Sequence, residues 1–443
     1  MTAYSKKRKK ARIKKEWVST FREVAAANSW DYPRLHEGSN FTDISAGGYS
    51  YVDLVLSGGG MLGIAHAGYI HALEESNLRF RAVAGTSAGA LSALMLSTLR
   101  RPDQYKGIRL AVALAMLDGD KLLESCRARL YFRHNFEYKL KWPWLLALGV
   151  FVDRICARGM ITGTAFQELL EDFLKDRCFP KESKKFLEYL NKDRRPNFTC
   201  FDPSRKTDDL NLELSVVVSD ITRDKKIVLP DMPELEQKKK EEEAFEEEDR
   251  NIARYVRASA SVYGFFVPVE MKLSQSGIDA LGNAGKKEEN ERNKRQKYSV
   301  DLVDGGLMSN FPMSLFHRPS SETSLDNHGR PFTTPRLPSF GVKLNPIRNS
   351  FNKTKGVFKY LGALFRTAID VADDEFIRLH PDFEQLVTTI DIEDDIEPFN
   401  VFMTRKEKIR LFKLGYRAGK EFLMRFNWLK HKEYRAAIHS HAG

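Results

Sequence analysis

Two glycine-rich motifs, each directly after a predicted strand, contain the residue types that acyl transfer needs. The first is the run Gly58-Gly59-Gly60, and the second is the Gly-x-Ser-x-Gly pattern at residues 85–89. A serine in that pattern stands on a strained strand-to-helix turn, and its flanking glycines avoid collisions with the backbone. Backbone N–H groups of a glycine run that opens a helix can bind an anion. The pair therefore predicts Ser87 as a nucleophile and an oxyanion hole formed by Gly58, Gly59, Gly60 and Met61.

A third motif, Asp304-Gly305-Gly306, follows the short apolar stretch at residues 298–302. A carboxylate at the end of a strand can act as a general base. Asp-Gly is also a strong turn signal. A turn alone, however, does not account for the apolar strand before Asp304 and the segment Asn310-Phe311-Pro312 after it. We therefore expect Asp304 to be catalytic.

Together the three motifs resemble the signature of the patatin-like phospholipase family. Segments 216–221, 258–269 and 310–312 also look like family segments, so the resemblance covers roughly residues 50–345. It implies a three-layer α/β fold with a mostly parallel central sheet and helices on both faces. It also implies a Ser-Asp dyad in which Asp304 takes the Ser87 proton directly, without a cofactor or a metal. The remaining motif glycines are Gly63, Gly85, Gly89, Gly305 and Gly306.

One position departs from the family pattern. The family usually has Arg or Lys at position 62, where this sequence has Leu62. An oxyanion hole made of backbone N–H groups survives this change. The change puts in question whether the side chain at position 62 helps to anchor the loop or to bind an anionic headgroup.

Two other kinds of site compete with the dyad. Gly58, Gly60 and Gly63 have the spacing of a dinucleotide-binding loop, but that pattern alone is weak and no acid follows at the expected distance. A Ser-His-Asp triad in the chain order of the α/β-hydrolases would take its histidine from the residues after Asp304. The eligible histidines are His317, His328 and His380. We expect His66 and His71, on the helix after the glycine run, to be structural.

The pattern of elements around the motifs predicts how they are positioned. A strand before the glycine run, a helix over 64–76, a strand over 82–85 and a helix over 88–99 alternate, as in a parallel sheet with helical crossovers. Residues 103–185 are mainly helical by periodicity, and residues 339–344 are predicted to form the final sheet strand. The segment 346–443 is expected to be mainly helical and to pack on the core.

The net charge of +11 is concentrated in the N-terminal extension, residues 1–28, because eight cations within residues 6–15 leave only +3 for the remainder. We expect residues 1–15 to be an unstructured charge block and residues 16–28 to form an amphipathic helix. Its apolar face would carry Trp17, Val18, Phe21 and Val24. This combination predicts binding to an anionic phospholipid membrane surface. A solvated tail is the alternative, and the mildly basic remainder makes nucleic acid an unlikely partner.

Three segments are predicted to be peripheral to the chemistry. The charge runs near 234–250 and 286–297 are expected to be solvated inserts in the catalytic domain. The apolar run at 142–152 has 11 residues, whereas a transmembrane helix needs about 20. It is either a buried core helix or a lid near the lipid entrance.

Cysteine usage and the N-terminus bear on the compartment. Cys126, Cys156, Cys178 and Cys200 have no metal-ligand or redox spacing and are interpreted as free thiols. No apolar segment follows the N-terminal cations, so we expect no cleaved signal peptide. The expected location is cytoplasmic and peripheral at membranes, with secretion by a signal-independent route left open.

The sequence therefore predicts an enzyme that hydrolyses carboxylic esters of glycerophospholipids through an acyl-enzyme. Two alternatives remain: a Ser-His-Asp lipase or esterase acting on neutral lipids, and a non-catalytic membrane-binding protein on a lipase fold. An uncontrolled lipase would harm a cytoplasm, so a latent enzyme with an activator of unknown identity is compatible with the sequence.

Overall fold

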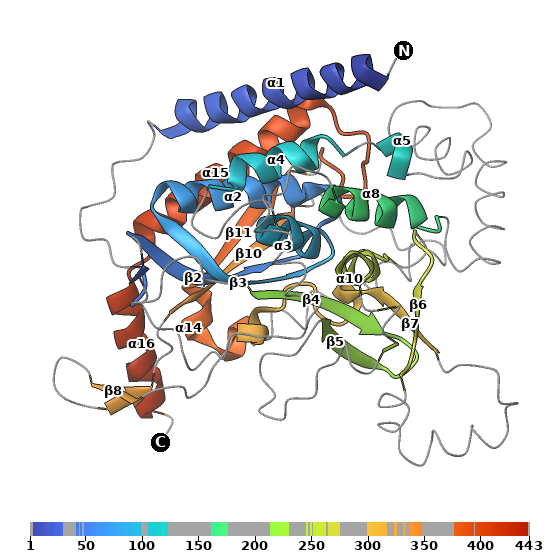
Figure 1. The fold of residues 1–443 in the computed structure, drawn as a ribbon. Coiled ribbons are helices and arrows are strands. Elements are labelled where there is room, and N and C mark those ends of the chain that lie inside the picture. Colours follow the sequence, from blue (N-terminus) through green and yellow to red (C-terminus); the bar gives the residue numbers. More distant parts are fainter. Residues whose placement is uncertain are drawn as a thin grey trace, which may run out of the picture.

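A mostly parallel sheet with helices on both sides forms the centre of the protein (Figure 1). We analysed a computed structural model. It describes residues 3–29, 41–43, 45–46, 48–98, 105–117, 119–122, 161–175, 213–229, 245–246, 249, 251–262, 265–274, 299–316, 323–325, 331–333, 337–347, 376–393 and 395–441. The architecture is the three-layer α/β fold that the resemblance implied.

The main sheet has the strand order β11-β10-β2-β3-β4-β7-β6, with β1 paired to β2 and β5 paired to β4. The pairs from β11 to β4 are parallel, and β7, β6 and β5 join antiparallel. The strands are β1 (Ser45–Ala46), β2 (Tyr49–Leu56), β3 (Leu78–Thr86), β4 (Glu213–Asp220), β5 (Lys225–Leu229), β6 (Val269–Lys272), β7 (Ser299–Asp304), β10 (Ser339–Pro346) and β11 (Val387–Ile392). A separate hairpin joins β8 (Thr323–Leu325) to β9 (Pro331–Thr333).

The central strands are covered on both faces, which explains their nearly continuous apolar sequence. Every residue of β2 from Tyr51 to Leu56 is buried. The first crossover runs from β2 through the 3-10 turn η1 (Gly60–Gly63) and helix α2 (Ile64–Glu75) to β3. Helix α3 (Ala88–Thr98) then follows β3 and is buried along its whole length. The predicted alternation around the two glycine motifs is thus confirmed.

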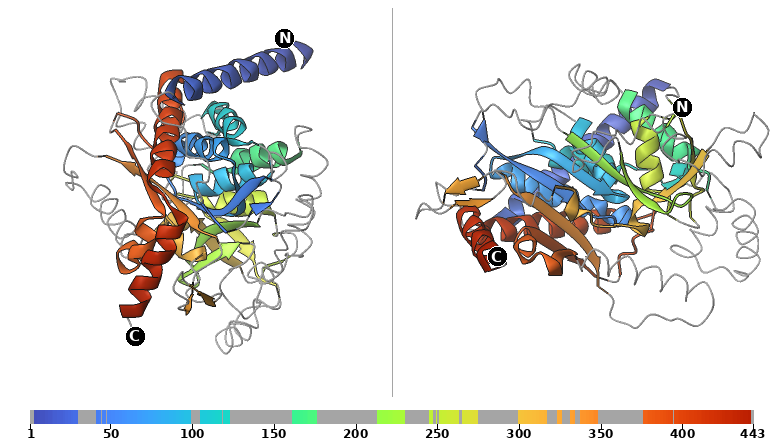
Figure 2. Two further views of the ribbon diagram at one scale, coloured as in Figure 1. Left: turned by 90° about the vertical axis from the view of Figure 1, so that its left-hand side faces the viewer. Right: turned by 90° about the horizontal axis from the view of Figure 1, so that it is seen from below.

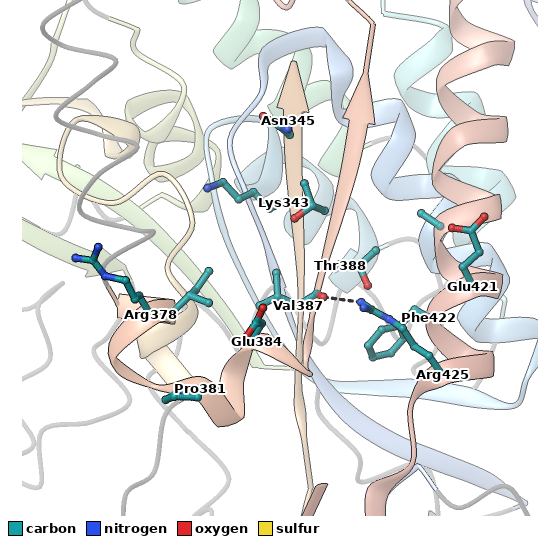
Figure 3. A pocket seen from close by; sticks show the side chains of 13 residues that line it. Lys343, Asn345, Arg378, Pro381, Glu384, Val387, Thr388, Glu421, Phe422 and Arg425 are labelled. Carbon is teal, nitrogen blue, oxygen red and sulfur yellow. Dashed lines mark hydrogen bonds between the residues drawn. The ribbon is translucent and has the colours of Figure 1, made fainter. Parts of the chain in front are cut away.

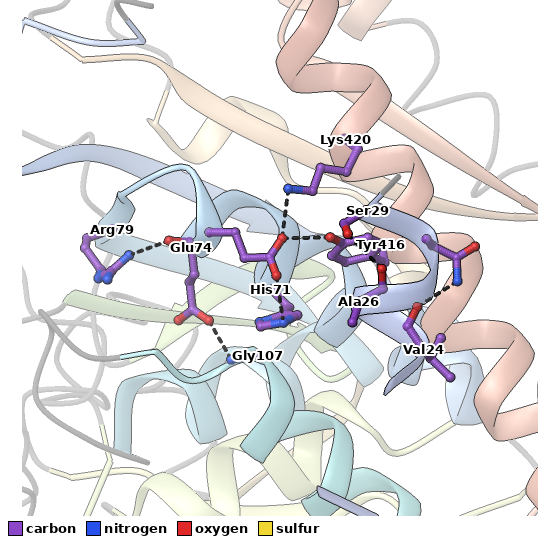
Figure 4. Close-up of polar contacts among 11 residues, drawn as sticks. Val24, Ala26, Ser29, His71, Glu74, Arg79, Gly107, Tyr416 and Lys420 are labelled. Carbon is purple, nitrogen blue, oxygen red and sulfur yellow. Dashed lines mark hydrogen bonds and ion pairs between the residues drawn. The ribbon is translucent and has the colours of Figure 1, made fainter. Parts of the chain in front are cut away.

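Helix α2 is packed between α4 (Gly107–Ala115) and α15 (Arg405–Arg425). The contact with α15 is so close that a Cβ on Gly68 would lie 2.0 Å from the Phe412 carbonyl oxygen. Two carboxylates near the end of α2 fix it to both neighbours (Figure 4). Glu74 accepts the N–H groups of Lys106 and Gly107 at 2.6 and 2.7 Å, while Glu75 accepts the Tyr416 hydroxyl at 2.7 Å.

The N-terminal extension differs from its prediction. Helix α1 runs unbroken from Ala3 to Ser29, so the expectation of an unstructured block is wrong for residues 3–15. The face expected to insert into a membrane is instead packed against the body: Trp17 and Phe21 are buried, and the Phe21 ring lies 4.7 Å from that of Phe412. Arg405 stacks on Trp17. An apolar wedge formed by these side chains is therefore ruled out in this conformation.

Helices α1 and α15 run in the same direction, because Trp17 meets the start of α15 and Phe21 meets a residue two turns further along it. The cationic half of α1 consequently projects beyond the beginning of α15, as the blue helix does at the top of Figures 1 and 2. Its exposed cations are Arg8, Lys9, Lys10, Arg12, Lys14 and Lys15.

The described part of the C-terminal segment contains three helices, of which α15 packs on α2, and it also contributes a strand to the sheet. Residues 339–344 do form a strand, as part of β10, but the prediction that it is the final strand is wrong. Strand β11 follows it in the sequence, pairs in parallel with it and lies at the edge of the sheet. Helices α14 (Pro381–Glu384) and α16 (Trp428–His441) lie away from α1, which leaves the two termini at opposite ends of the molecule (Figure 2). Other described helices are α5 (Gly119–Leu122), α8 (Thr164–Lys175) and α10 (Ile252–Ser259), with 3-10 turns η6 (Gly305–Leu307) and η7 (Met313–Phe316).

Several predictions concern residues outside the described ranges. These are the apolar run at 142–152, the insert at 286–297, most of the insert near 234–250, the four cysteines, and two of the eligible histidines, His317 and His328. None of the described helices combines the length and hydropathy that crossing a bilayer requires.

Candidate active site

Ser87 lies on a sharp turn between β3 and α3, with a φ of 52°. Few non-glycine residues adopt this left-handed conformation, and it costs about 1–3 kcal/mol unless the surroundings enforce it. The surroundings do so here. The Ser87 N–H donates to the Ser259 hydroxyl at 2.9 Å, and Ser259 in turn donates to the Val217 carbonyl at 2.6 Å.

The glycines on either side of Ser87 allow the strand and the helix to come together. A Cβ on Gly85 would lie 2.3 Å from the Gly89 carbonyl carbon, and one on Gly89 would lie 2.1 Å from the Leu56 carbonyl oxygen. Both contacts are with backbone, which cannot rotate away. The motif therefore has the geometry of a nucleophile elbow.

Strands β3 and β7 bring Ser87 and Asp304 together. Thr86, the last residue of β3, pairs with Val217, and Asp304, the last residue of β7, pairs with the next residue of β4, Val218. Because β7 is antiparallel to β4 and β3 is parallel to it, the carboxyl ends of β3 and β7 meet there. A Cβ on Gly305 would lie only 3.0 Å from the Thr86 side chain.

The Asp304 carboxyl group is buried and incompletely hydrogen-bonded. Its Oδ1 accepts the Gly306 N–H at 2.7 Å, whereas its buried Oδ2 has no hydrogen-bond partner among the described residues. Burial raises the pKa of Asp304 to about 6, opposed by the Gly306 N–H and by the Ser87 hydroxyl. The Asp304 carboxyl group thus interacts with Ser87, and one of its two oxygens has no hydrogen-bond partner among the described residues.

The glycine run lies against the same serine. A Cβ on Gly58 would be 3.4 Å from the Ser87 Cβ. The N–H groups of Gly58 and Met61 donate to the carbonyls of Asn310 and Pro398, at 2.8 and 2.7 Å.

These two N–H groups are therefore already engaged, although the sequence predicted them as oxyanion donors. The hydrogen bonds among the described residues do not use the N–H groups of Gly59 and Gly60. The predicted set of four donors is thereby narrowed to Gly59 and Gly60.

Comparison with known proteins agrees with this geometry. The sequence model of the family described as patatin-like phospholipase matches residues 54–317, which include Ser87, Asp304 and the glycine run. The chain belongs to the patatin-like phospholipase family. This membership assigns the protein to the lipid acyl hydrolases.

Individual relatives are distant. The uncharacterised protein YqhO of Bacillus subtilis is 27% identical over 380 residues, which are 85% of this chain and all of YqhO. VipD from Legionella pneumophila is 17% identical, with a TM-score of 0.38 over 88% of this chain and 71% of its own. In the ExoU–SpcU complex from the type III secretion system of Pseudomonas aeruginosa, the matched chain is 13% identical. Its TM-score is 0.33 over 91% of this chain and 59% of its own.

Three further residues, Arg257, Ser259 and Ser261, support Ser87 and Asp304, and the sequence did not predict a role for them. Ser261 accepts the Asp304 N–H at its carbonyl oxygen, 3.0 Å away. The buried Arg257 donates to the Ser261 hydroxyl and to the carbonyls of Thr162, Gly163 and Val267. The available signal was the pair Ser259 and Ser261 at the start of the family-like segment 258–269, directly after Arg257, because buried serines and a buried arginine need hydrogen-bond partners.

Leu62, the departure from the family pattern, is fully buried in the core. In this fold a cation at position 62 would lose its hydration without an evident partner. Leucine therefore suits the orientation of this residue, and position 62 offers no charge to a headgroup.

His66, His71 and His380 have partners other than Ser87 and Asp304. His66 is buried in α2, where burial lowers its pKa to about 3, and its nearest polar partner is Ser92 at 3.5 Å. Burial also lowers the pKa of His71, to about 4, and His71 pairs with Glu75. His380 interacts with the Phe376 carbonyl near α14. Within the described ranges, no hydrogen bond or ion pair joins a histidine to Ser87 or Asp304.

A cavity of about 840 Å³ is lined by residues of β10, β11, α14 and α15 (Figure 3). Both cations and carboxylates line it, among them Lys343, Arg378, Glu384, Glu421 and Arg425. None of the predicted catalytic residues lines it. Within the described residues, no cluster of three or more His, Cys, Asp or Glu side chains has the arrangement of a metal site.

Proposed function

We propose that this protein hydrolyses a carboxylic ester of a glycerophospholipid through an acyl-enzyme on Ser87. One observation supports the proposal most strongly: the buried Asp304 carboxyl group has a free oxygen beside a strained serine, and its pKa is about 6. A carboxylate with that pKa is ionised at neutral pH, and it is a stronger base than an exposed aspartate.

In the first half-reaction, Asp304 accepts the hydroxyl proton as the Ser87 Oγ attacks the ester carbonyl carbon. The carbonyl π electrons move to its oxygen, which becomes an oxyanion near the N–H groups of Gly59 and Gly60. Removing one such donor costs about 100- to 1,000-fold in rate in comparable sites. Collapse of the intermediate breaks the bond to the alcohol, which leaves with the proton from Asp304.

In the second half-reaction, Asp304 takes a proton from water, and the hydroxide oxygen attacks the acyl carbon. The bond to Ser87 Oγ breaks, and the proton returns from Asp304 to the serine. A fatty acid is released and the enzyme is restored. The same carboxylate thus serves as base and acid in both halves.

The substrate surface is also part of the proposal. The cationic half of α1 would hold the enzyme at an anionic phospholipid membrane, since each cation near such a surface contributes about 1 kcal/mol. Burial of Trp17 and Phe21 leaves charge, without an apolar wedge, as the attractive force. This role is consistent with a cytoplasmic enzyme that is peripheral at membranes.

The deciding experiment combines a serine-reactive fluorophosphonate probe with mass spectrometry of lipids released from mixed liposomes, with and without cell extract as a source of an activator. Wild-type protein should be labelled and should release fatty acids. Ser87→Ala should abolish both, and Asp304→Asn should lower hydrolysis at least about 1,000-fold, roughly 4 kcal/mol of barrier.

His66→Gln is the matched control, because this histidine is buried and its Nδ1 pairs with Ser92 rather than with Ser87 or Asp304. A folded His66→Gln enzyme that is as inactive as Asp304→Asn would contradict the dyad. Absence of labelling and of lipid products under every condition would instead indicate a non-catalytic protein. Products from triacylglycerol alone would favour a neutral lipase.

A further inference from the structure

A loop from the C-terminal segment, residues 395–403, covers the glycine run although it lies beyond the region that matches the family. It is held in shape by its own contacts. The N–H of Asn400 donates to the Glu397 carbonyl, and the N–H of Phe402 donates to the Asn400 side chain. Three of the loop's own side chains are buried, those of Ile396, Val401 and Met403. The 395–403 loop is therefore a fixed part of the fold.

The loop holds the proposed oxyanion hole in place. The Pro398 carbonyl accepts the Met61 N–H at 2.7 Å. Gly60 has a φ of +58°, and a Cβ there would lie 2.3 Å from the same carbonyl oxygen. Only glycine suits both this conformation and this contact. The 395–403 loop and the glycine run are thus fitted to each other.

Phe399 lies in this loop between the partly buried Pro398 and Asn400, and it is 44% exposed. An atom of its ring would be 3.6 Å from a Cβ on Gly60. Phe399 thus places an aromatic ring, partly open to solvent, beside a predicted oxyanion donor.

Phe399 begins a row of four aromatic rings. Its ring centroid lies 6.1 Å from that of Phe265, which lies 4.8 Å from that of Phe266, which in turn lies 6.1 Å from that of Phe166 on α8. Phe265 and Phe266 are partly buried. Phe266 is held in position by a bridge to Ile161 and by Arg257, which stacks on its ring. The row of rings therefore extends from Phe399, beside Gly60, to Phe166 on α8.

We propose that Phe399, together with Phe265 and Phe266, contacts the acyl chain of the ester and determines the chain length that the enzyme prefers. The inference rests on the proposed function, because it needs the ester carbonyl oxygen at Gly59 and Gly60. The first methylene groups of the chain are bonded to that carbonyl carbon and so begin beside these glycines. Apolar area buried between chain and rings then favours longer chains.

The test compares p-nitrophenyl butyrate with p-nitrophenyl octanoate, both below their aggregation limits. We expect Phe399→Ala to lower kcat/KM for octanoate at least tenfold and to change kcat/KM for butyrate less than twofold. Phe399→Leu should restore part of the preference, because it returns apolar area without the ring. Leu429→Ala is the matched control, since Leu429 is 48% exposed on α16, away from this row.

An unchanged octanoate-to-butyrate ratio in Phe399→Ala would overturn the inference. Equal losses on both esters would also overturn it, because they would mean that Phe399 only supports the glycine run.

Binding of decanoic acid to Ser87→Ala, measured by calorimetry, separates this inference from the proposed reaction. We expect the additional change Phe399→Ala to weaken this binding about tenfold. If wild-type protein hydrolyses neither ester but Phe399 still controls fatty-acid binding, the reaction fails and the acyl site stands. Binding that is indifferent to Phe399 rejects the acyl site.

Discussion

At the scale of single residues, Ser87 and Asp304 each occupy an unfavourable state. Ser87 has a backbone conformation that L residues avoid, and Asp304 is a buried acid with one unpartnered oxygen. Neither state stabilises the fold by itself. Their costs are offset by neighbours such as Ser259, which accepts the Ser87 N–H.

The raised pKa of Asp304 predicts the acid limb of the reaction. Below about pH 6 the carboxyl group is protonated and cannot accept the Ser87 proton, and above that pH it is ionised. The kcat/KM for a neutral short-chain ester should therefore rise with pH through an apparent pKa near 6 and then level off. Circular dichroism over the same range would establish that the protein stays folded. A rate that is flat between pH 5 and 8 would be inconsistent with this assignment.

Ser259 is predicted to position the nucleophile without touching the substrate. Ser259→Ala removes the acceptor of the Ser87 N–H and leaves a buried donor unpaired, which costs about 1–3 kcal/mol. We expect kcat to fall about tenfold or more while KM changes little, and Ser259→Thr to recover part of the loss. Ser97→Ala is a suitable control, because the buried Ser97 hydroxyl bonds only to Ala93 within its own helix. Equal effects of the two alanine variants on kcat would refute the positioning role.

At the scale of elements, the sequence predicted the strand-loop-helix-strand-helix order around both glycine motifs, because apolar runs and glycines are local signals. It did not predict that the N–H groups of Gly58 and Met61 donate to the carbonyls of Asn310 and Pro398, because those partners lie far away in the chain. The apolar face of α1 was predicted to contact a membrane, because a stripe of apolar residues indicates burial but does not identify the surface that buries it. The partners are α4 and α15, each of which has its own apolar face.

Helix α4 depends on the buried carboxylate of Glu74, whose pKa is raised to about 7, mainly by burial. Between about pH 4.5 and 7 the folded protein binds the proton more tightly than the unfolded chain does, so this group lowers stability as the pH rises. Relative to Glu74→Gln, the wild type should lose up to about 3 kcal/mol of unfolding free energy across this window. Urea titrations of both proteins at pH 5 and pH 7.5 measure this difference. A constant gap between the two would argue against the assigned shift.

The cationic half of α1 gives a prediction about membrane binding. Lys10→Gln with Lys15→Gln removes two exposed charges without disturbing the buried Trp17 and Phe21. Two cations are worth about 2 kcal/mol near an anionic surface, so binding to phosphatidylglycerol vesicles at low salt should weaken at least fivefold. Hydrolysis of a soluble ester should not change.

The control for this prediction is Lys413→Gln with Lys430→Gln, which removes two exposed lysines from the C-terminal helices. If both double variants bind vesicles equally well, the role of α1 is rejected. Binding of the same helix to DNA, with no effect on vesicles, would favour a nucleic-acid partner.

At the scale of the whole molecule, the family-matched region does not close its own core. Residues 54–317 include α2 and β2, but α15 covers α2, and β10 pairs with β2. A chain that ends at residue 347 should therefore expose the face of α2 that carries Gly68 and Tyr69. We expect it to lose cooperative melting and fluorophosphonate labelling, as measured by circular dichroism and gel fluorescence. A truncated chain that melts like the full chain would disprove this dependence.

The hydrogen bond from Met61 to Pro398 also has a consequence for the order of events during synthesis. Ser87 and Asp304 leave the ribosome well before Pro398, since translation proceeds from the N-terminus and folding begins on the emerging chain. Until residues 395–403 have also emerged, Ser87 and Asp304 are present without the loop that fixes the glycine run. Under the proposed function, a growing polypeptide that lacks this loop would have no fixed oxyanion hole, and attack on the surrounding lipids would begin only after the loop has docked.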